Sequence, residues 1–364
     1  MGDRRLWRHF DYWLLAAVLL LLVFGLAMVR SATLGTPDRE RLVWDQMAVA
    51  IVGLILLFVV AIFDYRLLSN VQPVLYVVTL LLLTATLVIG VVKFGAQRWI
   101  ALGSFTIQPS EFAKPLVVLI LAKYLADREK HVGKLRTVLV SLLFIAPLIA
   151  LVYRQPDLST SIVLMVAWFT MIVAAGMRSF HIGLLGGSTL MALPFIWLNL
   201  ASYQRDRVLL FLDPGRDEWA KYNIDQARIA IGSGGWIGKG YASGTQSQGH
   251  FLKVRHTDFI FSVIGEEMGL IGCVLLMVLV VVLVLRALRA ASLARDTYGR
   301  LICVGVATVV GFQAFINIGM NLGVLPVTGV PLPFISYGRS AMLSLLPMMG
   351  LVESVVMRHR KLEF

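Results

Sequence analysis

Three polar residues, His256-Thr257-Asp258, end a long polar segment and stand directly before an apolar run. A carboxylate at such a position can take a proton from an attacking hydroxyl group, which is the work of a general base. It can equally cap the following helix, because Asp at a helix start accepts backbone N–H groups. From position alone capping is the commoner role, so both interpretations of Asp258 stay open.

Two further motifs place charged residues at the starts of apolar runs. In residues 108–114, QPSEFAK, Pro109 suits a first helical position, and Glu111 and Lys114 lie three residues apart on one helical face. They form either a self-satisfied ion pair or the lining of a cavity for a charged head group. Asp157 follows Pro156 at another helix start, where a cap is the simpler interpretation.

Two carboxylates, Glu266 and Glu267, fall inside the apolar run that follows Asp258. Charges within a membrane segment are costly, so the two residues indicate either a function or pairing with a basic side chain.

The glycine-rich residues 232–240 superficially resemble a phosphate-binding loop, but that pattern needs Gly at position 233, where Ser stands, and Ser or Thr at position 240, where Gly stands. We predict no nucleotide cofactor. A flexible loop that approaches a ligand through its backbone stays open.

A metal site has no recognisable ligand pattern, because His250, His256 and Asp258 match no zinc spacing. A hard divalent cation, Mg²⁺ or Mn²⁺, held jointly by a carboxylate and a substrate pyrophosphate fits better. Its protein ligands are unknown from the sequence.

The elements that position these residues must cross a membrane. Only 15% of the 364 residues are charged, against roughly 25% in soluble domains. Apolar runs recur that are long enough for a ~30 Å hydrocarbon core. We predict an all-α polytopic membrane protein of about ten transmembrane helices, at residues 12–30, 45–63, 72–92, 110–126, 137–153, 158–176, 180–200, 258–285, 300–321 and 333–356.

The basic residues of the short loops and tails set the orientation of these helices. With the N-terminus inside, the inner side carries 17 Lys and Arg residues and the outer short loops carry 6. Both termini are therefore predicted to be cytoplasmic. Residues 201–257 form one large extracytoplasmic loop, whose aromatic residues argue against disorder. The net charge of +12 reflects orientation, and we predict no binding of nucleic acid.

Residues 317–340 contain three prolines with interleaved glycines, so they cannot form one continuous helix. Non-helical backbone at membrane depth is tolerated only where it is buried in protein or lines a cavity. We predict a cavity wall here, facing the outer side beneath the large loop.

Together these segments resemble the SEDS family (shape, elongation, division and sporulation), the membrane peptidoglycan polymerases. The resemblance follows nearly the whole chain in order, through residues 94–100 (FGAQRWI), 108–114, 155–157 (QPD), 211–214 (FLDP), 223–227 (NIDQA), 232–240, 256–259 (HTDF) and 331–338. It implies a single SEDS-type transmembrane domain over residues 1–364. The short N-terminus and Phe10-Asp11-Tyr12 are more similar to the elongation branch, RodA, than to the division branch, FtsW.

The resemblance implies a glycosyltransferase that polymerises lipid II, an undecaprenyl-pyrophosphate-linked disaccharide-pentapeptide, at the outer face of the cytoplasmic membrane during cell elongation. It makes Asp258 the catalytic residue. It also implies divalent-cation dependence, and as partners a class B penicillin-binding transpeptidase and other membrane proteins of the elongation complex. The substrate-binding or cavity positions are Glu111, Lys114, Arg98, Asp157, His256, Thr257, Gln108 and Ser336.

Four residues depart from the family pattern. Lys253-Val254 stands where the family usually has Pro-Glu, and Arg339 follows Gly338 where the family has a second glycine. Arg339 changes both backbone freedom and charge, and either contacts pyrophosphate or extends to the membrane surface. Ser159 replaces a glycine, which is a milder change.

We hypothesise that Asp258 takes the proton from the 4-hydroxyl of the acceptor GlcNAc, whose oxygen then attacks the anomeric carbon of the donor MurNAc. The α-linked pyrophosphate leaves and a β-1,4 bond forms, a single displacement with inversion. Lys114, Arg98 or a Mg²⁺-like ion is expected to stabilise the departing pyrophosphate.

Two functions of other classes stay open. A flippase for lipid-linked precursors would use the polar residues as a translocation path, although few charges lie near the midplane. A scaffold that positions the transpeptidase would need no catalytic Asp258 at all.

Overall fold

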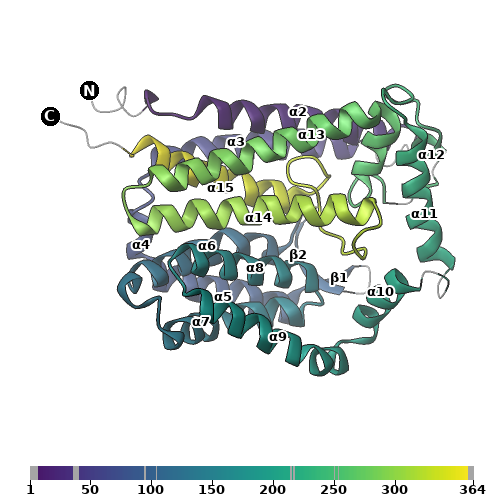
Figure 1. The fold of residues 1–364 in the computed structure, drawn as a ribbon. Coiled ribbons are helices and arrows are strands. Elements are labelled where there is room, and N and C mark those ends of the chain that lie inside the picture. The colour runs from purple at the N-terminus through teal and green to yellow at the C-terminus, as the bar shows by residue number, and fades with distance from the viewer. Residues whose placement is uncertain are drawn as a thin grey trace.

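The computed structural model is a bundle of long helices that lie side by side (Figure 1). It describes residues 7–35, 41–93, 96–103, 105–213, 215, 218–249, 251–252 and 254–359, so His250 and Lys253 lie outside the described residues. The ten main helices are α2 (Tyr12–Thr33), α3 (Arg41–Ile62), α5 (Gln72–Ile89), α6 (Pro109–Ala126), α7 (Leu135–Arg154), α8 (Leu158–Ala174), α9 (Ser179–Asn199), α13 (Ile260–Leu293), α14 (Thr297–Asn321) and α15 (Arg339–Met357).

Each of the ten predicted spans coincides with one of these helices. Within the described residues, eight of them are long and apolar enough to cross a membrane. The other two are α6, with 18 residues, and α8, with 17. A largely helical membrane fold is thereby confirmed, whereas the count of ten crossings stays a prediction.

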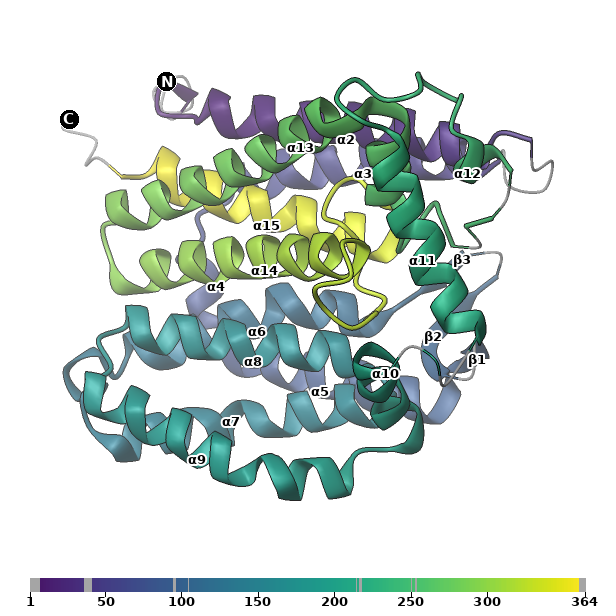
Figure 2. The same cartoon turned by 45° about the vertical axis from the view of Figure 1, so that its right-hand side comes forward.

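The shorter elements lie at the ends of the bundle (Figures 1 and 2). One end, here called the loop end, holds the three helices of residues 201–257 and a small sheet. The opposite end, the terminal end, holds α4, the start of α2 and the end of α15. The short helices are α4 (Leu67–Asn70), η2 (Glu129–His131), α10 (Ser202–Leu212), α11 (Glu218–Ser233) and α12 (Thr245–Gln248). The common end agrees with both termini facing one side, which the basic residues predict to be cytoplasmic.

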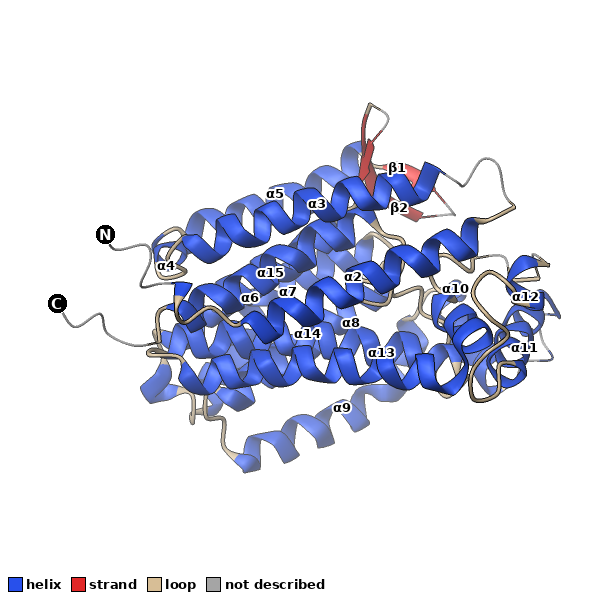
Figure 3. Cartoon of the chain, turned by 90° about the horizontal axis from the view of Figure 1, so that it is seen from above, coloured by secondary structure: helices blue, strands red, loops and turns tan. Residues whose placement is uncertain are grey.

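The small sheet was not predicted, so the all-α description is incomplete. Strands β1 (Val91–Lys93), β2 (Ala96–Leu102) and β3 (Phe105–Ile107) connect α5 to α6 in the order β1-β2-β3. Both pairings are antiparallel, with Val91 opposite Trp99 and Ile100 opposite Ile107. Strands this short carry almost no periodic signal in a sequence. Figure 3 shows them beside the loop end, where β2 presents Arg98.

Two predicted helix limits are wrong. The tenth span was expected from residue 333, but α15 begins at Arg339, because Pro331 and Pro333 keep the preceding backbone out of a helix. The eighth span was expected to end at residue 285, but α13 continues to Leu293. Arg286, one residue beyond the expected end, therefore lies within α13, and it pairs with Asp11 at 2.5 Å.

The core of the bundle lies around α14 and α15. α15 packs against α3, and α14 packs against α13, α6 and α8. In the most apolar 18-residue stretch of α15, 89% is buried within the protein, whereas in the corresponding stretch of α9 only 6% is buried. Figure 3 shows α9 set apart from the other helices. α9 is therefore a peripheral helix whose apolar surface faces lipid.

The long helix α13 is broken at Gly269, whose φ of 63° and ψ of −160° are not helical. The amides of Leu270 and Ile271 would ordinarily bond to the carbonyls four residues earlier. They donate instead to the carbonyls of Gly235 and Trp236, at 2.9 and 3.1 Å. The carbonyls of Glu266 and Glu267 accept from the amides of Lys239 and Gly240, each at 3.0 Å. The glycine-rich segment is thus inserted into the hydrogen-bond ladder of α13.

The carboxylates of Glu266 and Glu267 hold the same segment in place. Glu266 accepts from the Lys239 ammonium at 3.0 Å and from the amides of Gln246 and Ser247 at 2.8 and 2.9 Å. Both glutamates are buried. Of the two interpretations left open, pairing with a basic residue holds for Glu266, whereas Glu267 accepts from the Ser31 hydroxyl at 2.6 Å and from the Ala242 amide at 3.0 Å. The segment approaches α13 through its glycine backbone.

Replacing Gly238 by alanine is expected to lower the free energy of unfolding by about 1–3 kcal/mol, through strain and overpacking. Gly238 has a φ of +78°, and an added Cβ would lie 2.2 Å from the carbonyl oxygen of Glu267. The check is thermal unfolding of the detergent-solubilised protein. Gly186→Ala on α9 is the matched control, since its Cβ meets nothing within 4 Å. Equal melting temperatures for the two variants would contradict the role given to this contact.

Candidate active site

Asp258 lies half-buried in the turn that leads into α13. The N-cap of α13 is Phe259, and no side chain caps the helix, so capping does not explain Asp258. The backbone carbonyl of Asp258 accepts from the side-chain amides of Asn317 and Asn321, at 3.2 and 2.9 Å. These two bonds fix the backbone that carries the carboxylate.

Asn317 and Asn321 are a fully buried pair, one turn apart on α14. Asn317 also donates to the carbonyl of Val330 at 2.7 Å, and Asn321 accepts from the Ser262 hydroxyl at 2.7 Å. Sequence reasoning did not include the pair among the site residues. A signal was present, because two amides at i and i+4 inside an apolar helix must face a polar partner.

His256 and Thr257 are braced by the non-helical segment before α15. The Ser336 hydroxyl donates to the Thr257 carbonyl at 2.7 Å, and the Tyr337 amide donates to the His256 carbonyl at 2.9 Å. The rings of His256 and Tyr337 lie 5.9 Å apart between centroids. Arg255, which the sequence analysis did not single out, is buried and donates to a backbone carbonyl of α2. Of the predicted residues, Ser336 therefore contacts the backbone of Thr257, which directly precedes Asp258.

Burial raises the pKa of the Asp258 carboxyl to about 6, and Arg207, a hydrogen bond from Thr257 and Arg98 oppose that rise. A group with such a pKa is largely ionised at neutral pH and can still accept a proton efficiently. The two arginines come from separate elements, Arg98 from β2 and Arg207 from α10. Positive charge near the carboxylate also suits an anionic leaving group.

Arg207 is a site residue that sequence reasoning missed. It donates to the carbonyl of Thr328 at 2.9 Å. The residue after Thr328 is Gly329. Gly329 has a φ of +75°, and a Cβ there would lie 3.8 Å from Oδ2 of Asp258. Arg207 is one basic residue among several in the large loop, so composition alone could not identify it.

Asp157 and Gln108 form a polar network between the starts of α6 and α8. Asp157 caps α8 by accepting from the Thr160 amide at 3.2 Å, which confirms the capping interpretation. Its other oxygen accepts from the Ser110 hydroxyl at 2.8 Å and from the side-chain amide of Gln108 at 3.1 Å. Fully occupied in this way, Asp157 fastens two helices together.

Ser159 joins this network to Asp258. Its hydroxyl donates to the Thr328 carbonyl at 2.6 Å, the same carbonyl that Arg207 contacts. A glycine, usual in the family at this position, has no side chain to make that bond. The departure at Ser159 therefore adds a contact rather than removing one.

Glu111 and Lys114 form a separate buried pair on α6, with 2.6 Å between Nζ and Oε2. Their side chains are 6% and 0% exposed. The predicted i, i+3 ion pair is confirmed. A role in receiving a charged head group is not tested by this geometry.

The non-helical residues 322–338 satisfy their backbone through side chains from other elements. Gln46 on α3 contacts the carbonyls of Ile335 and Ser336 at 3.5 and 3.4 Å. Such backbone is tolerated at membrane depth only with partners of this kind. Arg339 directly follows the segment; it pairs with Asp45 at 3.8 Å and lies over the Phe105 ring at 5.0 Å.

No group of three or more His, Cys, Asp or Glu side chains suited to a metal occurs in the part of the chain that the structure describes. Asp258 is the carboxylate that could share a divalent cation with a substrate pyrophosphate.

Comparison with known proteins relates the whole chain to one family. The model for a family of cell cycle proteins that includes FtsW, RodA and SpoVE matches residues 12–361. The peptidoglycan glycosyltransferase MrdB of Escherichia coli K12 is 39% identical over 359 residues, which cover 97% of this chain and 95% of MrdB.

Solved structures agree with the sequence comparison. A chain in a structure concerned with the coordination of polymerization and crosslinking by a peptidoglycan synthase complex matches with a TM-score of 0.83 and 32% identity. The match covers 96% of this chain and 98% of that chain. The rod shape determining protein RodA of Thermus thermophilus matches with a TM-score of 0.72 and 30% identity, over 95% of this chain and 96% of RodA.

Proposed function

The chain belongs to the family of cell cycle proteins that includes FtsW, RodA and SpoVE, and we propose that it polymerises lipid II with Asp258 as the general base. It is a multi-pass membrane protein and a glycosyltransferase of peptidoglycan synthesis, the activity for which its relative MrdB is named. The likeness to a rod shape determining protein supports a role in cell elongation.

The position of Asp258 is the observation that carries this proposal. Its backbone is held by Asn317 and Asn321 at 3.2 and 2.9 Å, whereas its carboxylate caps no helix. A carboxylate with a fixed backbone, a raised pKa and cationic neighbours has the properties of a general base.

The geometry supports the following division of labour. Asp258 accepts the proton of the acceptor's 4-hydroxyl as that oxygen attacks the anomeric carbon of the donor. Arg98 and Arg207, both close enough to lower the pKa of Asp258, stabilise the negative charge that develops on the leaving pyrophosphate. A divalent cation shared by Asp258 and the pyrophosphate would add charge stabilisation. Lys114, which the sequence grouped with Arg98, is paired with Glu111.

The test is a gel assay for glycan strands made from purified lipid II by the purified full-length protein. Strand formation is expected, and we include reactions with and without a class B penicillin-binding transpeptidase. Lipid II that crosses the bilayer of proteoliposomes without being polymerised would instead support a flippase. A scaffold would make no strands unless the partner itself polymerised.

The transpeptidase is proposed as the partner because a structural neighbour belongs to a peptidoglycan synthase complex in which polymerization and crosslinking are coordinated. A polymerase whose product must be crosslinked gains from direct attachment to the crosslinking enzyme, because attachment raises the local concentration of strands.

Polymerisation by the wild-type protein is expected to increase with pH through a midpoint near 6. Asp258 must be ionised to accept a proton, and burial raises its pKa to about 6. Below that value the ionised fraction, and with it the rate, should fall about tenfold per pH unit. Initial rates between pH 5 and 8 give the profile, with intact fold verified at each pH by size-exclusion chromatography. A rate that does not change between pH 5 and 7 would argue against a base with this pKa.

A further inference from the structure

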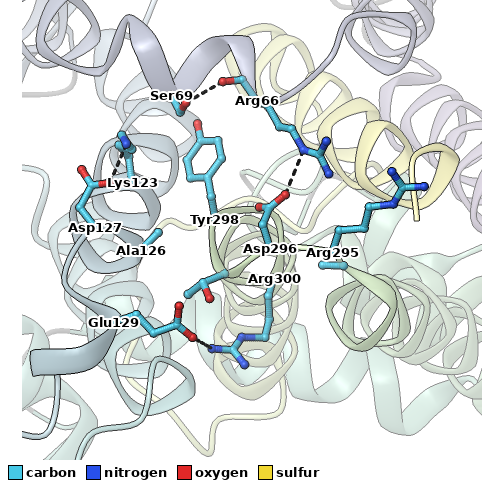
Figure 4. A pocket seen from close by; sticks show the side chains of 12 residues that line it. Arg66, Ser69, Lys123, Ala126, Asp127, Glu129, Arg295, Asp296, Tyr298 and Arg300 are labelled. Atoms are coloured by element: carbon cyan, nitrogen blue, oxygen red, sulfur yellow. Dashed lines mark hydrogen bonds and ion pairs between the residues drawn. The ribbon is translucent and has the colours of Figure 1, made fainter. Parts of the chain in front are cut away.

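A pocket of about 800 Å³ lies at the terminal end of the bundle, opposite Asp258. Figure 4 shows its walls, formed by the residues around α4, the end of α6 and the turn between α13 and α14. Its volume falls within the range of roughly 300–1,000 Å³ that small-molecule sites occupy. Polymerisation at Asp258 assigns no role to it.

The lining of this pocket has more cationic than anionic groups. Four basic side chains and three carboxylates line it, and each carboxylate is already engaged. Asp296 bonds to Arg66 at 3.0 Å, Asp127 to Lys123 at 2.6 Å and Glu129 to Arg300 at 3.9 Å. Within the described part of the chain, Arg295 forms no ion pair. Figure 4 shows the three pairs and Arg295 apart from them.

Two buried donors that line the pocket lack a hydrogen-bond partner. Tyr298 is 6% exposed, and its hydroxyl has no partner. Nε of Arg300 is also buried without one. Buried donors are nearly always satisfied, and an unsatisfied one costs roughly 1–3 kcal/mol. Neither atom is exposed to the pocket itself, so a ligand with acceptor oxygens would reach them only when neighbouring side chains reorient.

The start of α14 adds to this preference for an anion. α14 begins at Thr297, beside Tyr298 and Arg300, and has 25 residues. The N-terminus of a long helix carries partial positive charge. Asp296 caps it by accepting from the Gly299 amide at 2.7 Å, but the same carboxylate is shared with Arg66.

We propose that this pocket binds a ligand that carries a phosphoryl group. Arginine matches phosphate oxygens through two parallel N–H bonds, and Arg66, Arg295 and Arg300 all line the pocket. The volume leaves room for more than the phosphate itself. The pocket lies level with the ends of α6, α13 and α14, where a phospholipid headgroup and a soluble phosphorylated compound can both reach it.

The two ends of α14 link this pocket to the candidate active site. Tyr298 and Arg300 lie at its start, and Asn317 and Asn321, which hold the Asp258 carbonyl, lie at its other end. The helix is roughly 37 Å long at 1.5 Å per residue. A ligand at the terminal end therefore contacts the same helix that supports the proposed base.

Binding is tested with full-length protein stripped of lipid in dodecyl maltoside. The melting temperature is measured at increasing concentrations of sodium glycerol phosphate or of phosphatidylglycerol. Sodium chloride of matched ionic strength is the control. The first or second compound is expected to raise the melting temperature with concentration, because a ligand that binds the folded state stabilises it. Glycerol phosphate alone identifies a soluble ligand, and phosphatidylglycerol alone identifies a lipid headgroup.

The variants decide whether the pocket is the site. Arg295→Gln combined with Arg300→Gln is expected to weaken binding about tenfold or more, since charge-assisted bonds are lost. Tyr298→Phe is a conservative second variant and should weaken binding without a change of charge. Arg289→Gln, an exposed arginine on α13 outside the pocket, should bind as the wild type does. The proposal fails if neither phosphoryl compound acts or if the double variant binds unchanged. No polymerase activity enters the measurement, so this outcome is independent of the role of Asp258.

Discussion

Replacing Asp258 by asparagine is expected to slow lipid II polymerisation by about 10²–10⁴-fold, the usual contribution of a general base. Asparagine keeps the size and shape of the side chain but cannot accept the proton. The backbone bonds from Asn317 and Asn321 go to the Asp258 carbonyl, so they survive the substitution. The measurement is the initial rate of glycan strand formation by the purified variant, read on gels.

Asp45→Asn is the matched control, because it makes the same chemical change near the same end of the bundle. Asp45 is half-exposed on its side chain and pairs with Arg339 only at 3.8 Å. Its activity should stay within about threefold of wild type, as expected of a surface pair. A folded Asp258→Asn protein that polymerises at the wild-type rate would remove Asp258 as the base. Should the inactive variant instead melt well below wild type, Asp258→Glu provides a second variant that keeps the carboxylate.

Replacing Lys114 by methionine is expected to lower the free energy of unfolding by about 3–5 kcal/mol, because it leaves the buried Glu111 carboxylate without its partner. The two side chains are almost completely buried and 2.6 Å apart. Removing both charges, as Glu111→Gln with Lys114→Met, should restore most of that loss. Chemical or thermal unfolding in detergent measures the difference.

The same helix offers a control for this experiment. Lys123 and Asp127 also pair at 2.6 Å, but their side chains are 30% and 49% exposed. Lys123→Met is therefore expected to cost about 1 kcal/mol or less. If Lys114→Met proved as mild as Lys123→Met, or if the double variant were no more stable than the single one, the buried pair would not have the energetic weight given to it.

The helices could be predicted because their signal is local. Each apolar run is by itself long enough to predict a membrane-spanning segment. Within a bilayer such a segment must pair its own backbone groups, which favours a helix over other secondary structures. Two limits were nevertheless wrong: the start of α15, although Pro331 and Pro333 mark it in the sequence, and the end of α13. Arg286 lies inside α13 and pairs at 2.5 Å with Asp11, the N-cap residue of α2, and nothing near Arg286 in the chain indicates that partner. The three strands before α6 were missed for another reason: they are too short to show the alternation of apolar and polar residues that marks a strand.

The candidate site could be predicted in part. Ser336 contacts the backbone of the His256-Thr257-Asp258 motif through the Thr257 carbonyl, and both motifs had been recognised by resemblance. Arg207 had not, because its contact with Thr328 at 2.9 Å joins segments 121 residues apart. Glu266 and Glu267 show how a costly intramembrane charge can be structural: position within an apolar run cannot distinguish a ligand from a loop that inserts between two turns of a helix.

That insertion bears on how the protein is assembled in the cell. Residues 235–240 are synthesised before α13, so the segment that completes the hydrogen bonds at Gly269 has left the ribosome before its receiving helix does. Until the two meet, Leu270 and Ile271 must either extend a regular helix or leave amides unpaired in lipid, which is costly. The outer third of α13 therefore reaches its final form only after the large loop has been translocated and has folded back onto it. Membrane insertion and loop docking are, at this helix, one coupled step of biogenesis.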